Sequence, residues 1–254
     1  MSNDINQDIA KELVAQTAGK TYEDIAHPTA HATGQIISFI PRTIKVWLGK
    51  WEKWIMNGEY AIRETEMLLA EKLKHIPEDK IVEPEPYVAV PALQQLSYSL
   101  DSEELRELYA NLLASSMNID KKGEVHPAFV DIIKQLAPDE AKLLKYFSSQ
   151  EVIPAIEIQL KSESGKGYTV LDKLDLHIPA GVLDVYDNYR VYVENLCRLQ
   201  LIEMPQGIHY TDERLYTALE NKVVYVGIPK ERIQFGRKII RLTQFGAKFT
   251  EICK

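Results

Sequence analysis

The chain has 254 residues, of which 45% are hydrophobic and 26% are charged. This balance is typical of a globular protein with one or two ordinary cores. No stretch offers about 18 consecutive apolar residues, so the sequence predicts no membrane-spanning helix. Cys197 and Cys253 lie far apart, and no charged segment followed by an apolar one stands near Met1. We therefore expect neither secretion nor disulfide bonds, and we expect a cytoplasmic protein.

The net charge of −7 is unevenly distributed. Residues 1–120 carry 11 basic and 19 acidic side chains, whereas residues 121–254 carry 19 and 18. Within the second part, residues 222–254 hold eight basic and two acidic side chains. A basic end on an acidic chain can contact phosphate, or it can dock on the acidic half of the same chain.

The first part of the chain reads as helix. Residues 1–25 predict a short amphipathic arm, and residues 26–120 predict a helical domain. Within that domain, residues 81–90 contain two prolines and predict an extended linker, after which Pro91 opens a short helix. We expect this helix to lead directly into a longer one over residues 102–117.

Three tryptophans stand on one face of the helical stretch after residue 33. Trp47, Trp51 and Trp54 recur at i, i+4 and i+7, with basic residues on both sides. Such a face can rest on a membrane surface, where indole rings favour the headgroup level. It can equally fill the core of a helical bundle, so peripheral membrane contact or a partner face remains one of two interpretations.

The helix predicted over residues 102–117 carries the clearest signal. Asp101 and Glu104 have the spacing of a capping box, which predicts a helix start near Ser102. Apolar residues then recur at i, i+3, i+4, i+7, i+8 and i+12 from Leu105 to Met117, so one broad stripe should be buried. We expect structural hydrogen bonds from the polar residues beside this stripe. Its small residues can form a helix-packing seam within one chain or between two.

This segment resembles the signature of the abortive-infection alpha family, a bacterial group linked to phage defence. The resemblance covers roughly residues 20–254 and extends to His126–Phe129, Pro138–Ala141 and Arg241–Phe249. It implies a role in defence and no particular chemistry. The residues of the signature are Glu104, Leu105, Arg106, Leu108, Tyr109, Asn111, Leu112 and Leu113.

The second part of the chain, residues 121–254, predicts a smaller α+β domain. Helices should start at Pro127 and Pro138, and alternation over Ala155–Lys161 predicts a strand. A long helix should run from Asp184 to Gln200, and Thr243 should cap a last helix. Residues 201–204, 223–226 and 238–242 read as short β-type runs. This order predicts a winged-helix-like module, so the fold class is mainly α with a small α+β part.

In a winged-helix reading, the helix from Asp184 to Gln200 stands where a recognition helix would lie. Its basic side chains, together with those on the last strands, are the candidates for contact with nucleic acid phosphates. These candidates are Arg190, Arg198, Arg237, Lys238 and Arg241.

No motif in the sequence carries a recognisable reaction. Gly19–Thr21 imitates the end of a phosphate-binding loop but lacks the first glycine and follows a helical pattern. His27 and His31 stand at i, i+4, but no Cys is nearby and Pro28 lies between them, so a loop and a helix start are favoured over a metal site. Cys197 lies among leucines and reads as a small buried hydrophobe. We expect no cofactor and no metal, the sequence identifies no small-molecule substrate, and we lean towards a protein that is not an enzyme.

Two classes of function therefore stay open. The first is a defence protein that interacts with a protein partner, a second copy of itself or nucleic acid. The second is a toxic effector that acts on the host membrane or nucleic acid once infection is sensed. An effector freed of its control should slow growth without phage, whereas a binding module should not.

Overall fold

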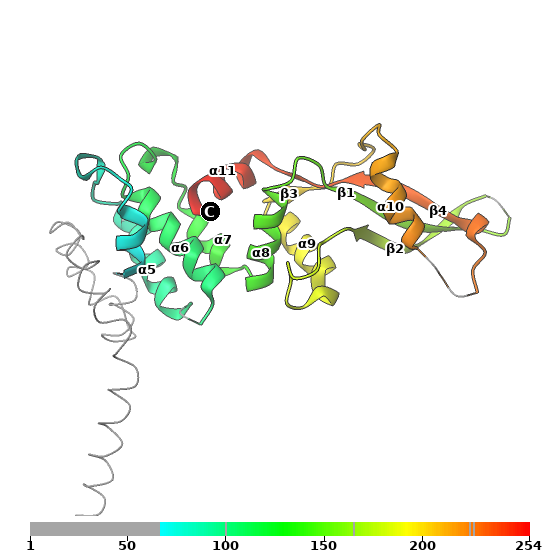
Figure 1. Cartoon of the computed structure of the whole chain (residues 1–254), viewed down its shortest axis with the longest axis horizontal. Helices are drawn as coiled ribbons and strands as arrows, with labels where there is room; N and C mark the ends of the chain where they lie inside the picture. Colours follow the sequence, from blue (N-terminus) through cyan, green and yellow to red (C-terminus); the bar gives the residue numbers. More distant parts are fainter. Residues whose placement is uncertain (1–66, 100, 165, 224, 226) are drawn as a thin grey trace, which may run out of the picture.

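The computed structural model describes residues 67–254 except residues 100, 165, 224 and 226. Within this part the chain is mainly α-helical with a small antiparallel sheet. Figure 1 shows helices gathered at one end and a sheet that projects as an arm at the other. The predicted arm over residues 1–25 and the tryptophan face of Trp47, Trp51 and Trp54 lie outside the described residues.

The helical end begins with residues 67–73, which are helical, and the 3-10 turn η2 (Glu78–Lys80). Residues 81–82 are extended and pair with residues 117–118. The amide of Val82 donates to the carbonyl of Met117 at 2.8 Å. Helix α5 (Pro86–Tyr98) then starts five residues earlier than predicted, and Pro91 lies inside it. The linker prediction was wrong for residues 86–90, since proline at the first helical position loses no hydrogen bond.

Helix α6 (Glu103–Ser116) occupies the predicted position of the signature helix and packs against α5, α7, α8 and α11. Its N-cap is Ser102 and not Asp101, because the Oγ of Ser102 accepts the amide of Leu105 at 3.4 Å. The predicted apolar stripe is buried along Tyr109, Leu112, Leu113 and Met117. The predicted helical periodicity of this segment was therefore confirmed, but its N-cap is one residue after the predicted Asp101.

Helices α7 (Ala128–Lys134) and α8 (Pro138–Phe147) start at the predicted prolines, after the 3-10 turn η3 (Lys122–Glu124). The last helix, α11 (Gln244–Cys253), returns to this end of the molecule (Figure 1). Phe129 of α7 meets Phe245 and Phe249 of α11 with ring centroids 5.4 and 5.3 Å apart. These aromatic contacts fix α11 against the helices that precede the sheet.

The arm is a three-stranded antiparallel sheet in the order β2-β1-β4, formed by β1 (Pro154–Lys161), β2 (Tyr168–Leu176) and β4 (Ile233–Ile239). Helix α10 (Arg214–Lys222) covers one face, and η5 (Lys230–Arg232) leads into β4. Ile156 and Ile158 of β1 pack under Tyr216 and Leu219 of α10 as a small separate core.

Sequence analysis identified β1 but neither β2 nor α10. The β-type run over residues 223–226 was wrong for Val223 and Tyr225, which follow α10 outside any strand. The run over 238–242 is divided, because β4 ends at Ile239 and Arg241–Leu242 form a separate strand, β5. That strand pairs with β3 (Ile202–Glu203), which lies within the run predicted at 201–204.

Helix α9 (Tyr189–Arg198) follows the 3-10 turn η4 (Tyr186–Asn188) and is shorter than the predicted helix over 184–200. Its start is delayed because the amides of Asp184 and Val185 are taken by the carboxylate of Asp139. Its end is set by Gln200, whose φ of 58° is left-handed.

One continuous core of buried side chains runs from Leu69 to Cys253 and joins the helical end to α9 and the β3-β5 pair. It therefore crosses the predicted boundary between residues 120 and 121. The division into a helical domain over 26–120 and an α+β domain over 121–254 stays a prediction about folding units.

Gly246 allows the closest approach between α11 and the β3-β5 pair. A Cβ atom at this position would lie 1.8 Å from the carbonyl oxygen of Leu201, which is backbone and cannot rotate away. We expect Gly246→Ala to lower the free energy of unfolding by about 3 kcal/mol or more, because the helix must move off the strand. Ala247→Ser, at the exposed neighbouring position, is the control, and chemical denaturation measures both. Equal stability of the two variants would contradict this packing.

Candidate functional site

The polar edge of the signature helix α6 holds the end of α11. Asn111 donates from Nδ2 to the carbonyl of Cys253 at 3.1 Å, and Ser115 donates from Oγ to the carbonyl of Ile252 at 2.9 Å. The last carbonyl groups of a helix have no partner within it, so these bonds satisfy groups that burial would otherwise penalise. Asn111 thus makes the structural hydrogen bond expected of it, and the seam of small residues on α6 receives a helix of the same chain.

The other signature residues serve the same packing. Tyr109 is buried and donates its hydroxyl to the carbonyl of Val130 at 3.3 Å, and burial raises the pKa of this hydroxyl. Leu112 and Leu113 are buried, while Leu105 and Leu108 are half-buried against the core. Arg106 is half-buried, and Glu104 joins a network of charged groups at the start of α6.

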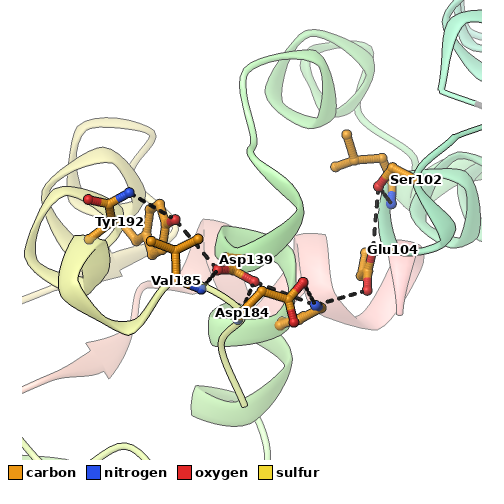
Figure 2. Close-up of polar contacts among 9 residues, drawn as sticks. Ser102, Glu104, Asp139, Asp184, Val185 and Tyr192 are labelled. Carbon is orange, nitrogen blue, oxygen red and sulfur yellow. Dashed lines mark hydrogen bonds and ion pairs between the residues drawn. The ribbon is translucent and has the colours of Figure 1, made fainter. Parts of the chain in front are cut away.

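That network centres on Asp139, which is 5% exposed and lies in the first turn of α8. Its carboxylate accepts the backbone amides of Asp184 at 3.0 Å and Val185 at 2.8 Å, and the hydroxyl of Tyr192 lies 3.5 Å away. Figure 2 shows how these contacts tie the segment before α9 to α8. Burial alone would raise the pKa of Asp139, but the two amides and Lys142 together lower it.

Lys142 links this carboxylate to the signature helix. Its ammonium group lies 2.7 Å from Asp184, 3.4 Å from Glu104 and 3.5 Å from Asp139. The hydrogen bond to Asp184 is the main reason why the pKa of Lys142 is raised. One cation thus joins α6, α8 and the segment that leads into α9.

Glu140, also buried, makes a second link between α8 and α9. Its Oε2 accepts the amide of Ala137 at 2.8 Å, which is half of a capping box, and the Nδ2 of Asn195 at 2.7 Å. The sequence predicted the helix start at Pro138 but not the roles of Lys142 and Asn195. Nothing local in the sequence marks their partners, which are 42 and 55 residues away.

The five basic candidates for nucleic acid contact all have partners within the chain. Arg237 lies 2.9 Å from Glu220 and 3.2 Å from Glu213, and Lys238 lies 2.8 Å from Glu157. Arg237 and Lys238 are consecutive on β4 and point to opposite faces of the sheet, since Arg237 stacks on Tyr216 under α10. The basic candidates therefore do not form one surface.

The remaining three lie on α9 and β5. Arg190 pairs with Asp172 and donates from Nε to the carbonyl of Leu174 at 2.9 Å. Arg198 is at the other end of α9, where its Nη1 donates to Gln135 at 3.1 Å, and Arg241 lies 2.7 Å from Glu203. In the described part of the chain, the acidic partners of the basic end belong to residues 121–254 and not to the acidic first half. Nucleic acid binding by these residues stays a prediction.

A pocket of about 380 Å³ opens between α6, α8 and α11. Leu108, Leu144, Phe249 and Cys253 form its apolar wall, and burial raises the pKa of the Cys253 thiol. Charged side chains from α6, from α8 and from the residue after α11 also line it. The charged residues are Glu103, Glu104, Glu107, Lys142, Lys145 and Lys254.

The other motifs singled out in the sequence do not come together as a site in the described residues. Cys197 is half-buried and burial raises the pKa of its thiol, which fits a packing role. Gly19–Thr21, His27 and His31 lie outside the described residues. Over residues 67–254 with their four gaps, no three His, Cys, Asp or Glu side chains converge to hold a metal. Among the helices described, none is both long and apolar enough to cross a membrane.

Comparison with known proteins gives one family. The family model described as abortive infection alpha matches residues 57–253. No curated protein matches the chain. The solved structure of an uncharacterized protein from the hydrocarbon-degrading marine bacterium Alcanivorax borkumensis SK2 is similar at 16% identity, over 49% of this chain and 90% of that one. Its TM-score of 0.33 does not establish a common fold.

The buried carboxylate of Asp139 gives a pH-dependent prediction. Its folded-state pKa is lowered, so its contribution to stability should be complete above the ordinary pKa of about 3.9 and lost as the pH falls below it. Asp139→Asn should lower the free energy of unfolding at neutral pH by about 1–3 kcal/mol, because the amide group cannot accept both backbone amides equally well. The variant should also lose less stability than the parent between pH 5 and pH 3.

Asp187→Asn is the matched control, since Asp187 is an exposed carboxylate in η4. Urea unfolding at several pH values measures all three proteins. A variant at Asp139 with the parent's stability and pH profile would show that the carboxylate does not hold the segment before α9.

Proposed function

Because the chain belongs to the abortive infection alpha family, we propose that it is a phage-defence protein that acts by binding a protein partner, without a chemical step of its own. The observation that carries this proposal is a set of five exposed apolar side chains on β2, at the 3-10 turn η4 and on α9. We call it the β2–α9 surface and define it by Tyr168, Val170, Val185, Tyr186 and Val191.

These five side chains are half of the ten large hydrophobic residues that are exposed in the described part of the chain. Val191 is 61% exposed and Tyr168 is 58% exposed. Arg190 joins the two elements, because it pairs with Asp172 and donates to the carbonyl of Leu174 on β2. Exposed apolar side chains gathered on neighbouring elements are typical of protein contact surfaces.

Strand β2 adds a second feature that suits a protein partner. It is at the edge of the sheet in the order β2-β1-β4, so one side of its backbone faces away from the other strands. Edge strands can pair with an extended segment of another protein through main-chain hydrogen bonds. The carbonyl of Leu174 is already used by Arg190 and Tyr189, which leaves the outer part of the strand, towards Tyr168, for such pairing.

Charge favours a protein partner over nucleic acid. Phosphate binding at Arg237, Lys238 or Arg241 would have to displace a carboxylate that each already contacts within 3.0 Å. Around α9 the exposed acids Asp187 and Glu194 would repel a phosphate backbone. Nucleic acid is therefore the second candidate in this proposal.

The winged-helix comparison belongs to the same proposal. Helices α8 and α9 are followed by β3 and β5, which pair antiparallel as the two strands of a wing would. The insertion between them holds α10 and β4, so the module would be a strongly extended variant. Winged-helix modules can dock on proteins through the same helix that others place in DNA, which agrees with a contact surface on α9.

The defence role gives a prediction in cells. A bacterial host that expresses the chain should support fewer plaques of at least some phages, with infected cells arrested before burst. Val191→Asp combined with Tyr168→Asp should restore plating, because a charge on each exposed side chain prevents apolar contact with a partner. Both positions are exposed, so thermal unfolding and expression should match the parent.

Ile208→Asp is the control, at an apolar residue that is 46% exposed in the segment between β3 and α10. Unaltered plating of a broad phage panel by the parent chain would contradict the defence role. Plating that stays reduced in the double variant would contradict the β2–α9 surface. Slow growth on overexpression without phage would favour the toxic effector on membrane or nucleic acid.

The nucleic acid alternative has its own test. We expect no binding of a labelled DNA duplex or single strand at low salt, measured by fluorescence anisotropy, because four of the five basic candidates are paired with carboxylates. The fifth, Arg198, is held by the neutral side chains of Asn195 and Gln135. Binding that falls linearly with salt on logarithmic axes would favour the alternative. In that case Arg237→Gln with Lys238→Gln should flatten the slope relative to Lys134→Gln, which is exposed on α7.

A further inference from the structure

The pocket between α6, α8 and α11 has the size and lining of a ligand site. Its volume of about 380 Å³ lies within the usual range for small-molecule pockets, about 300–1,000 Å³. The cavity on the other side of α11, about 190 Å³, lies below that range. Both apolar and charged side chains line it, so the pocket offers both burial and orientation to a ligand.

Half of the charged residues that line the pocket are in ion pairs. Glu107 pairs with Lys72, and Glu104 pairs with Lys142, which also contacts Asp139 and Asp184. These groups form fixed walls and are not free to neutralise a ligand. The six charged side chains that line the pocket are three acidic and three basic, so they carry no excess charge of either sign.

Three of the six charged residues, one acidic and two basic, have no ion pair among the described residues. Glu103, on the first turn of α6, and Lys145, on α8, both line the pocket and are exposed. Lys254 also lines the pocket, and its ammonium group donates only to the neutral hydroxyl of Ser148 at 2.9 Å. One acidic and two basic side chains without an ion pair among the described residues thus line a pocket that also has an apolar wall.

The length of the pocket along α6 suits a short peptide. Glu103 and Asn111 are about 12 Å apart along α6 at about 1.5 Å per residue, and Asn111 contacts the carbonyl next to Lys254. An extended tripeptide spans about 10 Å. We propose that this pocket binds a short apolar peptide with free ends, its amine towards Glu103 and its carboxylate towards Lys145 and Lys254.

Calorimetry of the full chain with the tripeptide Leu-Ala-Leu tests this proposal. The expected result is binding that weakens about three- to fivefold in Glu103→Gln and in Lys145→Gln, since each variant removes one charge pair. The capped peptide N-acetyl-Leu-Ala-Leu-amide should bind more weakly to the parent and should not distinguish the variants. Leu108→Trp, which fills the pocket, should remove binding of both peptides.

Controls and half-capped peptides assign each end. Glu151→Gln and Lys134→Gln alter exposed charges outside the pocket and should bind like the parent. N-acetylation alone should abolish the effect of Glu103→Gln and leave that of Lys145→Gln, and amidation alone should do the reverse. No binding at millimolar peptide, equal binding of free and capped peptides, or binding unchanged by all three pocket variants would overturn the proposal. None of these outcomes depends on the plating experiments.

Discussion

The carbonyl groups at the end of α11 must find donors, and the polar edge of α6 provides them. Asn111 and Ser115 stand one turn apart on α6, so both reach the last turn of α11 from one face. On the opposite side of α6, Tyr109 and Leu113 are buried among the helices around it. A single helix therefore joins segments that are more than 130 residues apart, and the core that runs from Leu69 to Cys253 depends on it.

The electrostatics of the molecule follow one pattern from end to end. Acidic and basic side chains are paired across elements: Lys142 with Asp184 and Glu104, Arg190 with Asp172, and Arg237 with Glu220. The excess of basic residues near the end of the sequence is therefore not an excess on one surface. Because of this pairing, the groups available to bind a partner are exposed apolar side chains and the few charges without an ion pair, and not a phosphate-binding patch.

Local patterns in the sequence predicted much of the helical end. The apolar stripe of α6, the proline starts of α7 and α8, and the Thr243 cap of α11 depend on residues within one or two turns. The arm was harder, because β2 mixes Asp172, Lys173 and Asp175 with apolar residues, and its register with β1 is irregular. The arm is stabilised by hydrogen bonds between strands and by the packing of α10 on the sheet. Neither contact can be read from the residue pattern of one segment.

The candidate site was predicted only in part for the same reason. Asn111 was expected to make a structural hydrogen bond, but its partner on α11 is 142 residues away. The delayed start of α9 could not be predicted either, since the carboxylate that holds Asp184 and Val185 belongs to α8. Both the hydrogen bond of Asn111 and the start of α9 depend on partners far away in the sequence. A single sequence shows the donor or the acceptor but not which residue it will contact.

The dependence of the core on α11 has a consequence for synthesis. While the ribosome is still making the segment before residue 244, Phe129 lacks its contacts with Phe245 and Phe249, and the seam of α6 is open to water. Helices α5 to α8 can form by then, but contacts over such sequence separations are slow to close. The nascent chain would expose this seam until α11 has been synthesised and has packed against α6. We therefore expect chaperones to bind the growing polypeptide more than the folded protein.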